Sequence, residues 1–172
     1  MTVFTLILMR SIFAPVALSL MLILPGCIGG DDGEDGESFP SFSFTGDDGK
    51  EYSKNSLEGE KYIIHISASW CPRCFKTMHN ISAALDEEIY LIISSDKDDE
   101  GNIQSWHNKV NESNYSNDLE VPFAVLPDLA LTLEIDAMPT IFLISAKGNI
   151  IDKHEGDLTI HSEITEFYNQ EL

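Results

Sequence analysis

The sequence predicts a single α/β domain in which helices flank a mixed central sheet. Three observations lead to this fold class. Apolar runs of strand length alternate along the chain with stretches of helical periodicity. The last two strand-like runs are separated by only a short turn, which is typical of an antiparallel pair. The 172 residues, 43% of them hydrophobic, are enough for one substantial core but too few for two comfortable domains.

Residues 1–26 are predicted to be a secretory signal peptide, because an apolar run over 11–24 follows Arg10. The tetrapeptide Leu24-Pro25-Gly26-Cys27 comes directly after that run. It resembles the lipobox of bacterial and archaeal lipoproteins, which implies cleavage before Cys27 and lipid on its sulfur. An uncleaved anchor is the alternative, because Pro25 departs from the usual small residue and the run is near the shortest length that spans a bilayer. Either route tethers the domain to the outer face of the membrane.

Residues 27–38 are predicted to be the lipidated Cys27 followed by a flexible linker, since they are rich in glycine and acids and have no core-forming pattern. The whole chain is acidic, with 10 Lys and Arg against 29 Asp and Glu and a formal net charge of −19. Such a surface disfavours binding to nucleic acid and close contact with anionic lipid. We therefore expect a soluble domain held at a distance from the bilayer, with no nucleic-acid partner.

The folded domain is predicted over residues 39–172 and begins with a hairpin at a sheet edge. Phe42 and Phe44 alternate with serines, and Asp47-Asp48-Gly49 then turns the chain. The run over 61–67 is nearly continuous in apolar residues, as in a central strand that is covered on both faces.

The remaining elements follow from hydrophobic spacing and turn residues. We expect a helix over 75–85, a strand over 89–93, a helix over 103–110, a polar loop over 111–120, an extended segment over 121–126, a helix over 128–135 capped by Asp128, strands over 140–145 and 149–154 joined through Lys147-Gly148, and a closing helix with Ile160, Ile164 and Phe167 on its apolar face.

The segment Ser69-Trp70-Cys71-Pro72-Arg73-Cys74 follows the central strand directly. Two cysteines three positions apart at the start of a helix have Cβ atoms about 5–6 Å apart, close enough for a disulfide. Pro72 suits the first helical position, and the helix dipole together with Arg73 favours the Cys71 thiolate. The pattern predicts a redox-active dithiol. A static disulfide and half of a zinc site are the alternatives, although zinc needs four ligands and Cys27 is the only other cysteine.

This motif and two later segments resemble the thioredoxin superfamily. The later segments are Met138-Pro139-Thr140-Ile141-Phe142-Leu143-Ile144 and Lys147-Gly148-Asn149-Ile150. The hairpin, the long insert before Pro139 and the membrane tether are most similar to the TlpA/ResA-like branch. The resemblance covers residues 39–172 and implies a thioredoxin-like fold, catalysis of thiol-disulfide exchange by Cys71 and Cys74, and no cofactor or metal.

The resemblance also implies supporting roles around the dithiol. Pro139 is expected to be cis and to lie beside the cysteines, and Met138 to offer backbone hydrogen bonds to an extended substrate. Trp70 is expected to pack beside the disulfide. His65 stands where thioredoxins carry a buried carboxylate, so that it either exchanges protons with Cys74 or is a hydrogen-bonded core histidine. The Glu that the membrane-anchored branch often carries three residues after the second cysteine is replaced by Thr77.

We expect Cys71 to attack a substrate disulfide and Cys74 to resolve the mixed disulfide. The resemblance implies that the protein reduces disulfides of other proteins outside the cytoplasm and receives its electrons from a membrane donor. The Pro72-Arg73 pair instead favours an oxidant, because it would stabilise the thiolate. Two other functions are weighed. A peroxiredoxin-like peroxidase is disfavoured by Ala68, where such enzymes carry Thr or Ser. A copper metallochaperone would use His65 or His79. Apart from this alternative, His79 and His107 are predicted to be residues of the surface or the rim of the site and not metal ligands.

Overall fold

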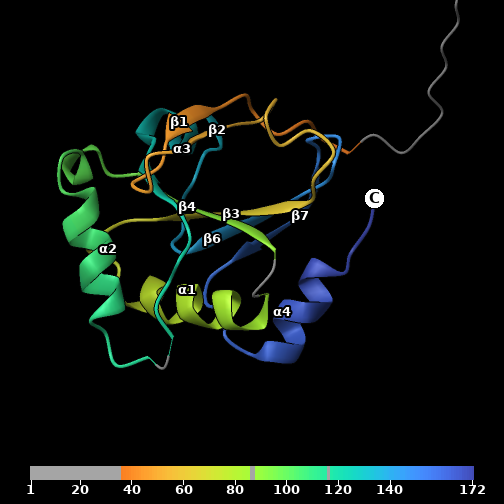
Figure 1. Cartoon of the computed structure of the whole chain (residues 1–172). Helices are drawn as coiled ribbons and strands as arrows, with labels where there is room; N and C mark the ends of the chain where they lie inside the picture. The colour runs from red at the N-terminus through yellow and green to blue at the C-terminus, as the bar shows by residue number, and fades with distance from the viewer. Residues whose placement is uncertain (1–35, 86–87, 116) are drawn as a thin grey trace, which may run out of the picture. The chain divides into compact units, whose positions relative to one another are not determined.

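The computed structural model describes residues 36–85, 88–115 and 117–172. The predicted signal peptide, Cys27 and most of the predicted linker lie outside the described residues. A five-stranded sheet with the strand order β5-β4-β3-β6-β7 forms the middle layer (Figure 1). Its strands are β3 (Tyr62–Ser67), β4 (Ile89–Ser94), β5 (Phe123–Val125), β6 (Thr140–Ile144) and β7 (Ile150–Glu155).

The pairing of the strands is mixed. β3 lies in the middle, parallel to β4 and antiparallel to β6. β5 continues the sheet in parallel beyond β4, and β7 continues it antiparallel beyond β6. All six residues of β3 are buried, which agrees with the nearly continuous apolar run in its sequence. This arrangement confirms the predicted fold class.

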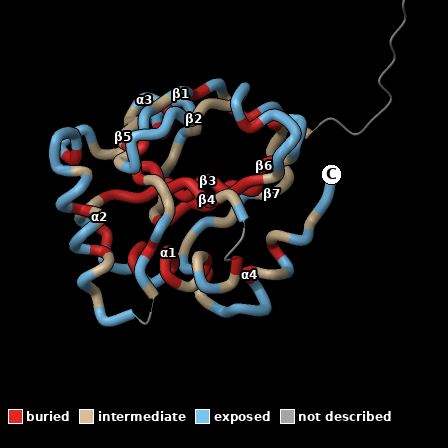
Figure 2. Tube along the Cα trace, viewed as in Figure 1, coloured by how far each residue is buried: buried red, intermediate tan, exposed pale blue. Residues whose placement is uncertain are grey.

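Helices α1 (Pro72–Ala84) and α4 (His161–Tyr168) cover one face of the sheet (Figure 1). Helix α2 (Ile103–Asn111) contacts β5, the edge strand. Buried residues continue from the strands into the inner side of α1 (Figure 2). The core on this face contains Cys71 and Cys74 together with Ile63, Met78, Ile81, Tyr90, Ile92, Trp106, Phe123, Ile141 and Ile164.

The hairpin strands β1 (Ser43–Thr45) and β2 (Glu51–Ser53) and helix α3 (Pro127–Thr132) lie on the other face (Figure 1). The residues of β3 alternate between the two cores, because successive side chains of a strand point to opposite faces. Ile64 and Ile66 therefore join this second core, which also contains Phe39, Phe42, Leu57, Tyr62, Leu91, Leu129 and Phe142.

The hairpin does not lie at an edge of the main sheet, as the sequence predicts, but forms a separate two-stranded sheet. Its turn is attached to β5 through Asp47, whose amide donates to the Phe123 carbonyl (3.0 Å) and whose Oδ1 accepts the Phe123 N–H (2.9 Å). The other oxygen of Asp47 lies 2.6 Å from Nδ1 of His107, and Nε2 of His107 lies 2.8 Å from the Leu119 carbonyl oxygen. The hairpin turn therefore covers the edge strand instead of extending the sheet.

Two expectations at helix ends are wrong. Asp128 does not cap α3, because Leu126 is the cap residue and Pro127 starts the helix. Asp128 lies in the first turn, where its negative charge still faces the positive end of the helix dipole. Ile160 is the cap residue of α4 and is 55% exposed, so that Ile164 and Phe167 form the buried face of that helix.

Candidate active site

The two cysteines lie at the junction between β3 and α1. Cys71 is the cap residue of α1, Pro72 is its first residue, and the Cys71 amide donates to the Ala68 carbonyl (3.1 Å). Cys71 and Cys74 form a disulfide, with an S–S distance of 2.03 Å and a Cα–Cα distance of 5.4 Å. The amides of the first turn and the positive end of the helix dipole face Cys71, which favours a thiolate there when the bond is reduced.

The two cysteines differ in accessibility. Cys74 is fully buried, whereas Cys71 keeps 4% of its surface exposed, so a substrate sulfur reaches Cys71 first. Trp70, which is expected to pack beside the disulfide, is 61% exposed. Its indole N–H donates to Asp96 (2.9 Å), which holds the ring at the rim of the site.

The segment that precedes β6 lies next to the disulfide. The peptide bond between Met138 and Pro139 is cis, as the resemblance implies. The antiparallel register pairs Ile66 with Thr140, which places Pro139 beside the carboxyl end of β3. Met138 packs against the core cluster that contains both cysteines. A cis proline is thus present beside the β3–α1 turn, where the sequence comparison placed it.

Two carboxylates hold the segment just before Cys71. They come from the residues after β4, where Asp99 ends the short 3₁₀ helix η1 (Lys97–Asp99). Asp99 is 5% exposed, and its Oδ2 accepts the Ser69 N–H (3.0 Å) and the Ser94 hydroxyl. Asp96 accepts the Trp70 indole N–H from the same side. Both carboxylates are hydrogen-bonded to residues one or two positions before Cys71, and their negative charges oppose the formation of a thiolate there.

Arg73 does not leave a free positive charge beside the cysteines. Its Nε donates to Asp157 Oδ1 at 2.9 Å, and both side chains are largely exposed. The hydrogen bond from Arg73 is the main cause that holds the pKa of Asp157 below its usual value. Because Asp157 offsets the guanidinium charge, Arg73 stabilises a Cys71 thiolate less than the sequence alone suggests.

His65 is a buried, neutral residue on the α1 side of β3. Its Nδ1 lies 2.5 Å from the Tyr90 hydroxyl, and its Nε2 has no hydrogen-bond partner among the described residues. Burial lowers the pKa of His65 to about 3. At neutral pH it is therefore an uncharged core histidine beside the Tyr90 hydroxyl, and proton exchange with Cys74 stays a prediction.

His79 is buried, at 2% exposure, and not at the surface as predicted. Its Nε2 lies 3.0 Å from the Val110 carbonyl oxygen, and its ring stacks on Tyr115. Among the described residues, no group of three or more His, Cys, Asp or Glu side chains is placed to hold a metal ion. Within residues 36–85, 88–115 and 117–172, no helix is both long and apolar enough to cross a membrane.

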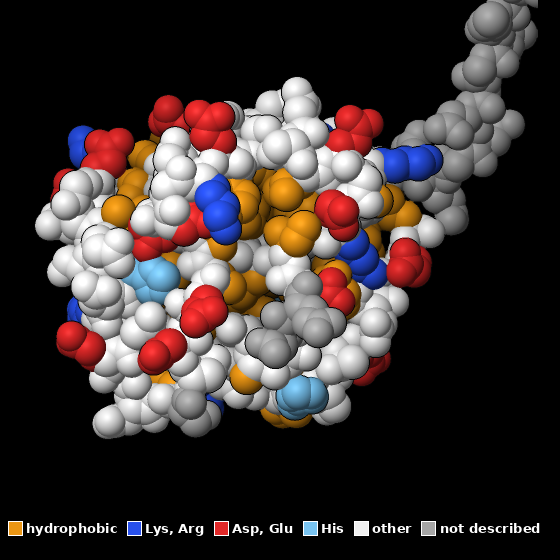
Figure 3. All heavy atoms as spheres, viewed as in Figure 1, with side chains coloured by type: hydrophobic (Ala, Val, Ile, Leu, Met, Phe, Trp, Pro, Cys, Tyr) orange, Lys and Arg blue, Asp and Glu red, His pale blue; other side chains and the backbone are white. Residues whose placement is uncertain are grey.

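Two hollows adjoin residues that lie close to the cysteines in sequence or in packing. One of about 410 Å³ adjoins Trp70 and is lined by polar residues, among them Asp96, Asp98 and Lys109. The other, of about 550 Å³, adjoins Met138 and is lined mainly by apolar residues. Figure 3 shows acidic side chains spread over the face in view, with hydrophobic side chains gathered near its centre.

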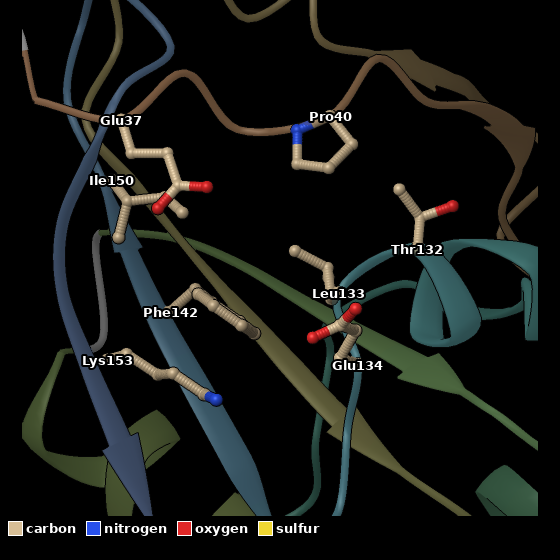
Figure 4. A pocket seen from close by; sticks show the side chains of 8 residues that line it. All are labelled: Glu37, Pro40, Thr132, Leu133, Glu134, Phe142, Ile150 and Lys153. Atoms are coloured by element: carbon tan, nitrogen blue, oxygen red, sulfur yellow. The ribbon is translucent and has the colours of Figure 1, made fainter.

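A third hollow, of about 420 Å³, lies on the face of the sheet opposite the cysteines. In Figure 4, Phe142 forms its floor, and Glu37, Glu134 and Lys153 approach it from three different segments. Lys153 already pairs with Glu155 at 2.6 Å. The hollow at Trp70 contains the residue directly before Cys71, and the hollow at Met138 contains a residue that packs against the core around both cysteines; the third hollow contains neither.

Sequence reasoning missed Asp96, Asp99, Tyr90 and Asp157. Asp99 lies 30 positions from its partner Ser69, and Asp157 lies 84 positions from Arg73. One signal was available for the first pair: Asp96 and Asp99 follow a buried strand, and the carboxyl ends of neighbouring parallel strands meet at one edge of a sheet. No local pattern indicates the partners of Asp157 or Tyr90.

Comparison with known proteins agrees with this geometry. Residues 34–170 match the Redoxin family. The chain is 28% identical over 130 residues to the thiol:disulfide interchange protein DsbE of Vibrio cholerae, covering 72% of this chain and 66% of that relative. It is 25% identical over 144 residues to the thiol-disulfide oxidoreductase ResA of Bacillus cereus, covering 80% and 78%. The crystal structure of the pneumococcal exposed lipoprotein thioredoxin from Streptococcus pneumoniae superposes with a TM-score of 0.62, at 22% identity, over 75% of this chain and 98% of that one.

The matches to the DsbE proteins of Vibrio cholerae and Tatumella citrea span 66% and 58% of those relatives' lengths. The family match covers nearly all of the described residues and includes Cys71, Cys74 and Pro139. The structural similarity independently shows the same fold. The chain therefore belongs to the redoxin family, as a TlpA/ResA-like member of the thioredoxin superfamily.

Proposed function

We propose that this protein is an extracytoplasmic thiol-disulfide oxidoreductase that reduces disulfides in other proteins. The observation that carries the proposal is the Cys71–Cys74 disulfide at the start of α1, with Cys71 4% exposed, Cys74 fully buried and a cis peptide bond at Pro139, beside the carboxyl end of β3. Relatives named as thiol:disulfide interchange proteins and thiol-disulfide oxidoreductases support the same activity.

The reaction needs no cofactor. The Cys71 thiolate of the reduced protein attacks a substrate disulfide, forms a new S–S bond and releases one substrate sulfur as a thiolate. The Cys74 thiolate then attacks the Cys71 sulfur, closes the Cys71–Cys74 disulfide and releases the second substrate sulfur. Two electrons and two protons pass from the dithiol to the substrate. Reduction by an external donor, which we place in the membrane, regenerates the dithiol.

The charges around Cys71 support the reducing direction. Asp99 accepts a hydrogen bond from the Ser69 amide, and Asp96 accepts one from the Trp70 indole. These are the two residues directly before Cys71, so both negative charges disfavour its thiolate. Arg73, the cation that would favour it, is paired with Asp157. A less stable thiolate makes the reduced protein a better electron donor.

The location rests on the sequence of residues 1–38. The apolar run and the lipobox-like Leu24–Cys27 support export and lipid attachment at Cys27, and the acidic linker would let the domain reach protein partners near the outer face of the membrane. Labelling with a radioactive fatty acid tests the attachment. We expect incorporation in the full chain and none in Cys27→Ala.

A trapping experiment tests the activity. In Cys74→Ser, Cys71 forms mixed disulfides that are not resolved, so substrates remain covalently attached and dissociate on addition of dithiothreitol. Cys71→Ser is the control and should trap none. The reduced wild type should also reduce insulin, and a reduction potential near about −270 mV, as in thioredoxin, supports the reductant. A potential near about −120 mV, as in DsbA, would reverse the direction.

The two other functions considered from the sequence are not favoured. The residue at the position of the peroxidase Thr or Ser is Ala68, which is buried. Peroxide consumption by the reduced protein at a rate comparable to insulin reduction would support the peroxidase. Stoichiometric Cu(I) binding that is lost in Cys71→Ala would support the metallochaperone.

A further inference from the structure

The hollow beside Met138 indicates which class of protein segment the site accepts, an inference that rests on the proposed disulfide reduction. The hollow lies at the carboxyl ends of the central strands. Ser95, on its wall, donates its amide N–H to the carbonyl of Ser67 (2.9 Å), at the end of the strand that leads to Cys71. Met138 contributes to the hollow and also packs against the core around the two cysteines. A chain lying over Cys71 can therefore place a neighbouring side chain in this hollow.

The surface of the hollow is aliphatic. Its apolar lining consists of Pro127, Ala130, Leu131, Ile135 and Met138. Leu131 is 75% exposed, the largest exposed fraction among the large hydrophobic residues that the structure describes. An aliphatic side chain of a substrate would remove this surface from water, which is favourable in proportion to the area covered.

The rim of the hollow is acidic and has no basic neighbour in the sequence around it. Glu134 and Asp136 line the hollow and are exposed, and their carboxylates have no hydrogen-bond or ion-pair partner among the described residues. Between Lys109 and Lys147 the chain contains six Asp and Glu residues and no Lys, Arg or His. The rim therefore offers carboxylates that form no ion pair among the described residues, beside an apolar surface.

The backbone at Glu134 is unusual. Its φ is +50°, in the left-handed region that glycine or asparagine normally occupies after a helix. Glutamate is disfavoured there because of its Cβ. Glu134 also lines the hollow that Figure 4 shows, so this residue belongs to both hollows.

We propose that the site preferentially reduces disulfides whose cysteine lies in an extended segment with an aliphatic residue and a Lys or Arg close by. The aliphatic side chain enters the hollow beside Met138, and the cation pairs with Glu134 and Asp136. Opposite charge raises the rate of encounter as well as the affinity, and salt weakens both. The sulfur chemistry is that of the proposed function, and the hollow decides which segment is presented to Cys71.

Four synthetic peptides test this proposal. Each carries one cysteine as a mixed disulfide with 2-mercaptoethanol, and the neighbouring positions carry Leu or Ser and Lys or Glu in the four combinations. The rate constant for reduction by the reduced wild type is measured for each. We expect the Leu/Lys peptide to exceed the Leu/Glu peptide about tenfold at low salt, and this ratio to fall as salt is added. We expect the Leu/Lys peptide to exceed the Ser/Lys peptide by about tenfold at any salt concentration.

Two variants test whether these preferences come from the hollow. The rate of each variant on a peptide is divided by its rate on hydroxyethyl disulfide, so that changes in the reactivity of the dithiol itself cancel. Glu134→Gln/Asp136→Asn should reduce the preference for Lys over Glu to less than about threefold, because both rim charges are lost. Leu131→Asn should reduce the preference for Leu over Ser. Glu58→Gln/Glu60→Gln is the matched control. It removes two exposed charges before β3, at the end of that strand opposite the cysteines, and should leave both preferences unchanged.

The outcomes separate this proposal from the function on which it rests. If all four peptides are reduced at equal rates, or if the control variant changes the preferences as much as the rim variant, the substrate class is wrong while disulfide reduction stands. If neither insulin nor hydroxyethyl disulfide is reduced, the proposed function fails and the substrate class fails with it.

Discussion

The charge of Asp99 should set part of the reducing strength of the dithiol. Asp99 is 5% exposed and accepts the Ser69 N–H at 3.0 Å, two residues before Cys71. Asp99→Asn removes this charge but keeps an oxygen that can accept the same hydrogen bond. With the negative charge gone, the Cys71 thiolate is more stable, the reduced form is favoured and the protein becomes a weaker reductant.

The size of this effect follows from the distance. Two residues of extended chain and one hydrogen bond place the carboxylate about 10 Å from the sulfur. Two unit charges at that distance interact by about 0.4 kcal/mol in bulk water and about 1.7 kcal/mol at an effective dielectric constant of about 20. We therefore expect the equilibrium constant with glutathione to change about two- to fifteenfold, which raises the reduction potential by about 10–35 mV.

The assay is equilibration of the protein in glutathione redox buffers, followed by alkylation of free thiols and measurement of the mass shift. Because the charge acts on the thiolate, the difference between wild type and Asp99→Asn should grow as the pH approaches the ordinary thiol range near about 8.5. Asp98→Asn is the matched control. Asp98 is adjacent and exposed, so solvent screens its charge, and the variant should shift the potential less. A folded Asp99→Asn with an unchanged or more negative potential in alkaline buffer would refute the reasoning, as would an equal shift in Asp98→Asn.

Three further predictions concern stability and are measured by chemical denaturation. The folded-state pKa of His65 is about 3, against 6.5 for an ordinary histidine, so below pH 6.5 the unfolded chain takes up a proton that the folded chain does not. The free energy of unfolding should therefore fall by about 1.4 kcal/mol per pH unit as the pH decreases from about 6.5 toward about 3, and this contribution should be missing in His65→Gln. A double-mutant cycle of Asp47→Asn and His107→Gln should give a coupling energy of about 1–3 kcal/mol, because the pair is largely buried; a value near zero would show that the hairpin turn is held by other contacts. Gly148→Ala and Gly101→Ala both place a side chain at φ +77°, but only the methyl at 148 meets another group, the Cε of Lys54. Both variants should lose about 1–2 kcal/mol, and Gly148→Ala should lose more; equal losses would mean that the lysine moves aside at no cost.

Local patterns in the sequence were sufficient for most of the fold. The apolar run at 61–67 predicts β3, and the helical spacing after Cys74 predicts α1, because burial on both faces or on one helix face leaves a period in the sequence. The hairpin was predicted at an edge of the main sheet, whereas it forms a separate two-stranded sheet. Its strands have a clear turn signal, but whether they join the main sheet depends on contacts between Asp47 and residues 60 or more positions away.

The candidate site divides in the same way. The Cys71–Cys74 spacing and Pro139 before a strand are local features, and they identified the disulfide and the cis proline. The charge balance around Cys71 is not local. From the sequence, Arg73 favours the thiolate; in the fold, Asp157 is the ion-pair partner of Arg73, and Asp99 binds the Ser69 amide.

The sequence by itself determined which residues can exchange a disulfide, since two cysteines on one turn at the start of a helix lie within bonding distance wherever that helix is placed. Only the tertiary structure decided the reduction potential of that pair and which protein segments the site can bind. Charges and apolar surfaces act through space, and the groups that face Cys71 come from β4, η1, the α3–β6 segment and the loop before α4, which only the folded chain brings together.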